Sequence, residues 1–452
     1  MAKILNRLSN YPMSEISPLP AALAATLTES AREFGIPGLA VCLLAPGRRS
    51  VFTTGVEVTG SERPVTGSTW FSVASLGKHV TACAVLDLAQ AGSLDLEAPI
   101  GRYLADVPAA WAQRPVLSLL RHTSGLPEYL AYTEAETVPE RRDEFMRSYG
   151  AMATVFEHDA GWIYTNTNYI LLGFLIAQLA GRPYAAALQA LFDRAGCVGA
   201  TVASPQWTRD ANALGLGIAG RDAASARREV IGDGDISFTA QGALDWMQAL
   251  LGGRLLSAAS MATMFSPALL HTSRPSPYGC GWFVDMLRGS VIGHHGGHYD
   301  GWTAMACLAP AQGCGVVVMC NLAPGNTRAV RHLAQLALEG YVPGSTPLSL
   351  LPIPDDAPAL TAMARAQLFR NGSALDPGCF AEELLHVVAH GSAVRNVINL
   401  WAGVEPLGFE LVEQLQQPTH RLRRYRVRYA DRVEHLLVGT TPENRIYWAW
   451  PL

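Results

Sequence analysis

Ser75 and Lys78 lie three positions apart and are the residue types that nucleophilic catalysis requires. A serine hydroxyl is a weak nucleophile until a base removes its proton, and a neutral lysine amine one helical turn away can be that base. The apolar residues that follow repeat at helical spacing as far as Gly92, which predicts a helix over 75–91 with Ser75 at its N-terminus. Backbone N–H groups and the helix dipole favour a developing negative charge there. The alternative is that Ser75 only caps the helix and Lys78 is an ordinary surface residue.

The lysine count favours the catalytic interpretation. The chain has 34 lysines and arginines, and only Lys3 and Lys78 among them are lysines. Arginine does not release its proton in a protein, whereas a buried lysine shifts its pKa readily and can become a base. A lysine retained at position 78 therefore suits a role that arginine could not fill.

A second candidate lies at Tyr164 and Asn166, just before an apolar segment predicted to be a helix over 170–179. A phenol held beside a lysine ammonium can ionise and shuttle protons. The alternative is a packing aromatic residue followed by a turn-forming asparagine, and this alternative is favoured when the motif is taken alone.

A third candidate is the glycine- and histidine-rich segment 293–302, which lies between two predicted strands and includes His295, Gly296 and Gly297. Paired glycines on a strand edge let another backbone or a ligand approach closely. Three histidines in the segment suggest zinc, but His294 and His295 would point to opposite faces of a strand, and no carboxylate or Cys-x-x-Cys pair completes a ligand set. We therefore expect neither a metal nor another cofactor.

Composition indicates a folded chain with a substantial core. The 452 residues are 49% hydrophobic and 16% charged, and the length suits one large domain plus a smaller one. A net charge of −4 gives no global reason to expect a nucleic acid or an anionic membrane as partner. The eight cysteines are irregularly spaced, and several lie inside apolar runs, so we expect them to be reduced and buried.

No membrane or export signal is evident in the sequence. Residues 1–20 lack an apolar core of signal-peptide length, and no segment approaches the roughly 18 apolar residues that a membrane span needs. We therefore expect a soluble cytoplasmic protein.

The order of predicted elements indicates a mixed α and β fold. Short apolar segments at hairpin spacing, near 38–58 and between 281 and 320, predict an antiparallel sheet flanked by helices, and residues 127–160 are helical in character. The proline-rich segment 342–358 reads as a linker. These patterns predict a main domain over 1–341 and a small α+β domain over 359–452, whose four last strands begin near 407, 421, 433 and 445.

One predicted C-terminal strand alternates arginine with apolar residues over 424–429. The arginines would share one face of the strand. That face is either an anion-binding surface or a solvated sheet face, and the solvated face is the favoured interpretation.

Taken together, the three candidates resemble the motifs of the serine β-lactamase and penicillin-binding-protein superfamily in order and approximate spacing. The resemblance covers about residues 20–340 and includes the flanking segments 122–126 and 164–173. Within that superfamily the chain is similar to class C β-lactamase-like esterases, D-aminopeptidases and related acyltransferases. The resemblance implies an antiparallel sheet covered by helices beside an all-helical subdomain, with the active site at their junction.

The resemblance also implies roles for individual residues. Ser75 is the nucleophile that forms an acyl-enzyme, and Lys78 and Tyr164 share the general-base work and return the proton to the leaving group. Asn166 orients substrate and lysine. His295, on the edge strand, belongs with the catalytic residues, and Gly296 and Gly297 bind the substrate. The backbone N–H groups of Ser75 and His298 form the oxyanion hole.

His295 is a departure from the family pattern, because many members have a lysine there, in a Lys-Thr-Gly motif. A permanent cation suits a carboxylate-bearing β-lactam, whereas histidine is largely neutral near pH 7. We therefore expect weak β-lactamase activity and a preference for esters, thioesters or amides. The nucleophile elbow of α/β-hydrolases does not match, because Val73 stands where that motif requires glycine.

Three functions remain open. The favoured one is a serine hydrolase that cleaves a small ester or a D-amino-acid-containing peptide or amide. The second is an acyltransferase or cyclising thioesterase that transfers the acyl group, from a carrier-bound thioester for example, to an amine or alcohol. The third is a non-catalytic binding protein on this fold. We expect a small-molecule or peptide partner, and the oligomeric state is left open.

Overall fold

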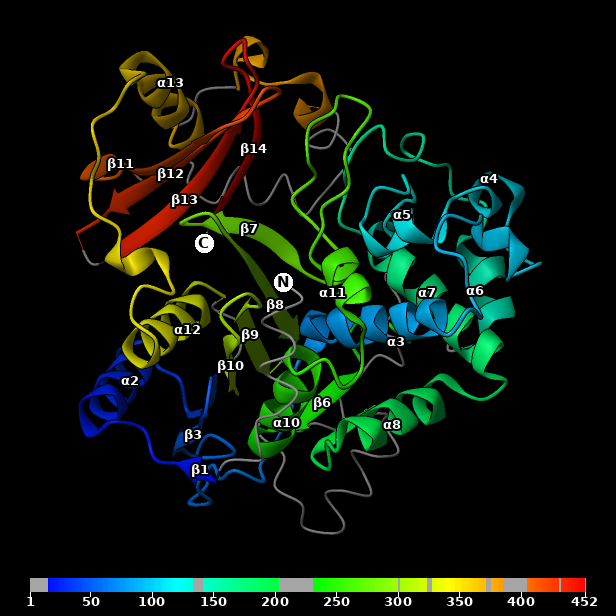
Figure 1. Cartoon of the computed structure of the whole chain (residues 1–452), viewed down its shortest axis with the longest axis horizontal. Helices are drawn as coiled ribbons and strands as arrows, with labels where there is room; N and C mark the ends of the chain where they lie inside the picture. Colours follow the sequence, from blue (N-terminus) through cyan, green and yellow to red (C-terminus); the bar gives the residue numbers. More distant parts are fainter. Residues whose placement is uncertain are drawn as a thin grey trace.

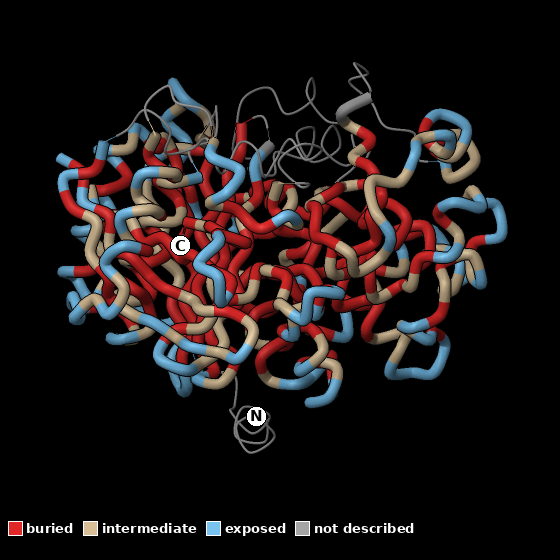
Figure 2. Tube along the Cα trace, turned by 90° about the horizontal axis from the view of Figure 1, so that it is seen from above, coloured by how far each residue is buried: buried red, intermediate tan, exposed pale blue. Residues whose placement is uncertain are grey.

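A computed structural model of the chain shows three parts side by side (Figure 1). It describes residues 15–132, 141–202, 231–299, 301–322, 327–370, 375–385, 405–430 and 432–451. A central sheet carries helices on both faces, a group of helices lies on one side of it, and a second sheet formed by the end of the chain lies on the other. Figure 2 shows buried backbone running through the middle of the molecule, with the exposed segments at the periphery.

The central sheet has seven strands in the order β1-β3-β2-β10-β9-β8-β7. All neighbouring pairs are antiparallel except β1 with β3, which is parallel, so the predicted antiparallel sheet is confirmed apart from one short strand. The strands are β1 (Ile16–Ser17), β2 (Gly38–Ala45), β3 (Arg48–Gly55), β7 (Phe283–Leu287), β8 (Ser290–Tyr299), β9 (Trp302–Ala309) and β10 (Cys314–Cys320).

Strand β2 shows why this sheet must be covered on both faces. All eight of its residues are buried, which is typical of a strand whose two faces both contact other elements. Leu39, Val41 and Leu43 pack into a core with α2 (Ala21–Glu33) and α12 (Thr327–Tyr341). Ala40 and Cys42 belong to the second core on the opposite face, beneath α10 (Ala240–Leu251).

The helical part surrounds α3 (Lys78–Gln90) and α7 (Asn166–Ala180), which pack against each other. The remaining members are α4 (Ala109–Ala112), α5 (Val116–Leu120), α6 (Arg142–Tyr149), α8 (Tyr184–Ala195) and α11 (Ala258–Met264). A small antiparallel sheet of β4 (Trp70–Ser72), β6 (Ile236–Thr239) and β5 (Ala200–Val202) joins this part to the central sheet. No single described helix is long and apolar enough to cross a membrane; α7 and α8 meet that requirement only together and are bent by 79°.

The chain ends in a four-stranded antiparallel sheet that packs beside β7. Its strands are β11 (Gly408–Gln416), β12 (Arg421–Arg428), β13 (Val433–Thr440) and β14 (Ile446–Pro451), close to the four predicted ranges, and α13 (Pro358–Leu368) precedes them. The last part of a helix predicted over 380–400 lies outside the described residues. The division of the chain at 341 and 359 stays a prediction.

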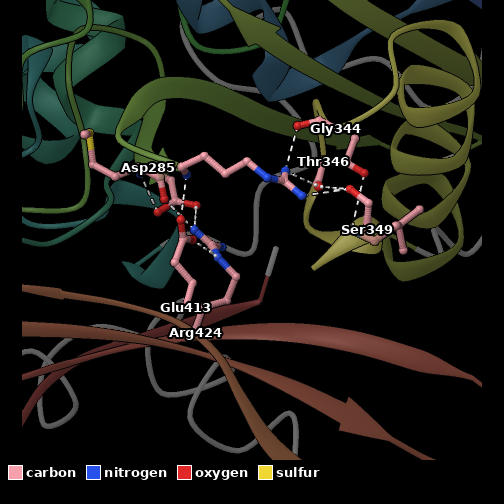
Figure 3. Close-up of polar contacts among 9 residues, drawn as sticks. Asp285, Gly344, Thr346, Ser349, Glu413 and Arg424 are labelled. Carbon is pink, nitrogen blue, oxygen red and sulfur yellow. Dashed lines mark hydrogen bonds and ion pairs between the residues drawn. The ribbon is translucent and has the colours of Figure 1, made fainter. Parts of the chain in front are cut away.

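Arg424 is the main polar link between this sheet and β7. Its side chain is 1% exposed and its guanidinium donates to Asp285 and Glu413, both at 2.9 Å (Figure 3). The backbone N–H of Arg288 donates to Glu413 at 2.6 Å, while the Arg288 side chain reaches Gly344. The prediction of a solvated arginine face is therefore wrong at Arg424, because the sheet packs this end of β12 against β7.

All eight cysteines are free, and six of them are buried, while Cys307 and Cys379 are partly buried.

Candidate active site

Ser75 lies in a tight turn at the junction of the central sheet and the helical part. The turn is the 3-10 segment η1 (Ala74–Gly77), and α3 begins only at Lys78. The predicted helix is therefore wrong over its first turn. Ala74 has φ +46°, a left-handed conformation that is uncommon for a residue with a side chain, because the chain reverses sharply after β4.

Lys78 is fully buried and points at Ser75. Its Nζ lies 3.1 Å from Ser75 Oγ, 2.7 Å from Asn166 Oδ1 and 2.6 Å from the backbone oxygen of Asp233. The last two atoms can only accept a hydrogen bond, whereas a serine hydroxyl can also donate one. A neutral amine would therefore satisfy both acceptors with its two protons and direct its lone pair at Ser75.

Tyr164 packs over Lys78 with its ring. The Lys78 Nζ lies 5.1 Å from the centre of the Tyr164 ring, within the range of a cation–π contact. The centre of the Tyr164 ring also lies 4.5 Å from that of the His122 ring. The imidazole of His122 is fully buried and its Nδ1 accepts hydrogen bonds from the Thr165 backbone N–H at 3.3 Å and from Asn168 at 3.1 Å. His122 therefore packs against Tyr164 from a fixed, buried position.

Asn166 is the first residue of α7, and Thr165 caps this helix by accepting from the Thr167 N–H. The backbone N–H of Asn166 donates to Glu128 Oε2 at 2.7 Å, while the Asn166 side chain binds Lys78. Burial raises the pKa of Glu128 to about 7, and the charge of Asp233 acts in the same direction, against hydrogen bonds from two backbone N–H groups and the charge of Lys78. A carboxyl whose pKa is raised to about 7 therefore contacts Asn166, the residue that also binds the predicted catalytic lysine.

His295 lies on β8 and is 2% exposed. Its Nδ1 donates to the Gly296 carbonyl at 2.6 Å, which leaves Nε2 to accept from the Tyr278 hydroxyl at 2.9 Å. Burial, followed by the charge of Lys78, holds the pKa of His295 well below its ordinary value. This direction agrees with the expected neutral histidine, and both ring nitrogens bind groups of the protein itself.

The second half of β8 forms the edge of the central sheet beside the serine. The predicted connection over 293–302 is strand as far as Tyr299, and β7 pairs with β8 only as far as His294. A Cβ atom on Gly297 would lie 1.9 Å from the Val73 carbonyl oxygen, whereas one on Gly296 would meet nothing closer than 3.6 Å. The predicted close approach of another backbone therefore occurs at Gly297.

The structure thus brings Ser75, Lys78, Tyr164 and Asn166 together, with Gly297 against the serine turn. His298, at the exposed end of β8, follows Gly297 directly. Backbone N–H groups of Ser75 and His298 are thereby carried by two segments that touch.

Sequence reasoning missed Glu128, Tyr278 and Asp233. Glu128 lies two residues after the segment 122–126 that carried part of the resemblance, so its position was a usable signal. Nothing local marks Tyr278 or Asp233, which reach the site through tertiary packing. The described histidines, cysteines and acidic residues include no group of three placed to hold a metal ion.

Residues 23–341 of the chain match the protein-family model described as Beta-lactamase. The chain belongs to the beta-lactamase family. This match confirms the resemblance found in the sequence and includes Ser75, Lys78, Tyr164 and His295.

Individual proteins agree with the family. Penicillin-binding protein 4* of Bacillus subtilis is 27% identical over 271 residues, 54% of this chain and 59% of that protein. The D-aminopeptidase of Gluconobacter oxydans is 26% identical over 318 residues, 67% of this chain and 59% of that protein. The octameric penicillin-binding protein homologue from Pyrococcus abyssi, a solved structure, has a TM-score of 0.60 at 16% identity and covers 94% of this chain and 97% of its own. The chain spans only about 40–59% of the length of the first curated relatives that it matches.

Proposed function

We propose that this protein is a serine hydrolase that cleaves a small ester or a D-amino-acid-containing amide or peptide through an acyl-enzyme on Ser75. The observation that carries the proposal is the fully buried Lys78, which lies 3.1 Å from Ser75 Oγ and is held there by two obligate acceptors. A surface lysine beside a capping serine would show neither the burial nor the paired acceptors.

In the proposed reaction Ser75 Oγ attacks the substrate carbonyl carbon while its proton passes to Lys78 Nζ. The carbonyl oxygen becomes negative and is stabilised by the backbone N–H groups of Ser75 and His298. The tetrahedral intermediate then collapses and its bond to the leaving group breaks. The leaving group takes the proton from Lys78 by way of the Tyr164 hydroxyl. Water then attacks the acyl-enzyme by the same route in reverse and releases the acid.

The surroundings of Lys78 support a substrate that is neutral or carries an ammonium group. Glu128 and the Asp233 carbonyl are acceptors, and His295 is neutral where many family members have a lysine. A substrate carboxylate would therefore find no cation at position 295, whereas an α-ammonium can pair with ionised Glu128. The D-aminopeptidase relative supports the same substrate class.

In this proposal His295 is a positioning residue. Its hydrogen bonds to Tyr278 and to the Gly296 carbonyl orient the end of β8 rather than the substrate.

The test is intact-mass spectrometry after brief exposure to nitrophenyl esters, to D- and L-aminoacyl amides and to a peptidyl thioester. We expect an acyl adduct on the wild type and none on Ser75→Ala, followed by release of the acid in water. An adduct that survives in Ser75→Ala, or no adduct and no turnover with any donor, would contradict the proposal. If an added amine or alcohol captures the acyl group faster than water does, the protein is an acyltransferase instead.

A further inference from the structure

A second cavity lies away from Ser75, among β7, β8, β9, α12 and the segment 345–347. Its walls combine apolar side chains, among them Leu287, Ile292, Met305 and Leu338, with the polar or charged residues Asp285, His294, Arg331, Gln335, Ser345 and Thr346. The carboxyl group of Asp285 is part of the lining, and Arg424 of the C-terminal sheet neutralises it through an ion pair (Figure 3).

Arg331 brings a positive charge into this cavity, where the charge of Glu434 acts on it without a direct ion pair. Its Nε is buried and has no hydrogen-bond partner, and no ion pair of Arg331 occurs among the described residues. Burial lowers the pKa of Arg331 to about 10, so the guanidinium remains charged at neutral pH. The neighbouring acid Glu434 pairs with Arg432 at 2.8 Å, and Asp285 pairs with Arg424. A buried cation is costly unless an anion or hydrogen-bond acceptor accompanies it.

His294 supplies a neutral donor on the same wall. It is 5% exposed and stacks on Phe283 with ring centres 5.5 Å apart. Burial lowers its pKa to about 3, helped by the charges of Arg331 and Arg424, so the ring has one N–H and one free nitrogen at neutral pH. Its backbone pairs with β7 and β9, whereas no hydrogen bond of the His294 ring occurs in the described part of the chain. The amide of Gln335, one turn along α12 from Arg331, lines the cavity as a further donor.

We propose that this cavity binds a short-chain monocarboxylate, with its carboxylate on Arg331, His294 and Gln335 and its alkyl group against Leu287, Ile292 and Leu338. Charge selects an anion, and the apolar walls select an organic anion over phosphate or chloride. The ligand would touch the central sheet, α12 and the segment leading to the C-terminal sheet at once. His294 and the predicted active-site residue His295 alternate along β8 and contact different surroundings, so this site is separate from the one proposed for catalysis.

The test is isothermal calorimetry on the full chain with acetate, butyrate and hexanoate, against phosphate and chloride at constant ionic strength. We expect butyrate to bind the wild type and to raise its melting temperature by about one to three degrees at saturating concentration. Arg331→Gln should weaken butyrate binding by about ten- to a hundredfold, because it removes a charge-assisted hydrogen bond. The matched control Arg182→Gln changes an exposed arginine and should bind as the wild type does.

A second variant keeps the test independent of the folding of Arg331→Gln. His294→Phe retains the ring stacked on Phe283 and removes the donor, so we expect about a two- to tenfold weaker affinity. No carboxylate binding to the wild type, unchanged affinity in Arg331→Gln, or equal binding of phosphate and butyrate would each overturn the proposal. None of these outcomes depends on hydrolase activity.

Discussion

Lys78 Nζ lies 3.1 Å from Ser75 Oγ, and the same nitrogen reaches the backbone oxygen of Asp233 at 2.6 Å, 155 positions further along the chain. The buried amine is therefore held in one orientation by groups from three separate segments. Rigid placement of a base beside a nucleophile is what proton transfer in a transition state requires.

Replacement of this lysine tests the assignment of the base. Lys78→Arg places a permanently protonated guanidinium beside Ser75, which cannot accept a proton as the neutral lysine amine would, so we expect kcat for ester hydrolysis to fall by about a hundred- to ten-thousandfold. Lys3→Arg, which changes the only other lysine, is the matched control and should leave kcat unchanged. The rates are measured with a nitrophenyl ester, and circular dichroism reports on folding. Near-normal turnover by a folded Lys78→Arg enzyme would exclude Lys78 as the base.

The two glycines of β8 should differ sharply in tolerance. Gly297→Ala would place a methyl group 1.9 Å from the Val73 carbonyl, so β8 must move away from the serine turn, at a cost of about 1–3 kcal/mol in unfolding free energy and with loss of activity. Gly296→Ala meets nothing closer than 3.6 Å and is the matched control. Urea unfolding and esterase assays on both variants measure the difference. Equal behaviour of the two would refute the close contact between β8 and the turn.

Glu128 should impose a pH dependence on substrates that carry an amine. Its pKa of about 7 leaves the carboxylate ionised above that pH and protonated below it. As the pH falls from 8 to 6, we expect kcat/KM for an aminoacyl amide to fall relative to that for an amine-free ester, by up to about tenfold per unit below 7. Glu128→Gln should lower the amide-to-ester ratio about tenfold or more at pH 8 and make it independent of pH. A ratio that stays constant in the wild type would remove Glu128 from substrate recognition.

The Arg424–Asp285 pair should hold the C-terminal sheet to the central one. Both side chains are almost completely buried, at 1% and 5% exposure, so removal of one partner leaves an unpaired buried charge. Arg424→Met should lower the unfolding free energy by about 3–5 kcal/mol, and the double variant Arg424→Met/Asp285→Leu should recover part of that loss. The measurement is a double-mutant cycle: denaturant unfolding of the wild type, of Arg424→Met, of Asp285→Leu and of the double variant. Additive effects of the two single changes would show that the pair is not coupled.

The aromatic contacts next to this ion pair explain why the two sheets meet near the candidate site. Trp450 of β14 stacks on Phe283 with ring centres 4.4 Å apart, and Phe283 lies 6.4 Å from Tyr164. The end of the chain is thereby connected to a predicted catalytic residue through two ring contacts. Nothing in the spacing of residues 445–450 indicated this contact.

Local chemistry is what the sequence determined by itself. Ser75 and Lys78 share one turn, Asn166 follows Tyr164 by two residues, and His294 and His295 alternate on one strand, so residue type and spacing were enough to select them. The strands of the central sheet could also be predicted, because a strand that is buried on both faces appears in the sequence as a continuous run of apolar residues. The tight turn after β4 could not be predicted from the local sequence. Ala74 has a positive φ there, and an alanine side chain does not favour that conformation.

Tertiary structure alone decided the environment of these residues. The burial of Lys78 against Asp233, the raised pKa of Glu128 and the burial of Arg424 all depend on segments that are distant in sequence. Desolvation and charge pairing act through space, so a residue's ionisation and hydrogen-bond partners follow from how the elements pack. Residue identities can thus be read from the chain, whereas which of them face one another, and in which protonation state, is set by the fold.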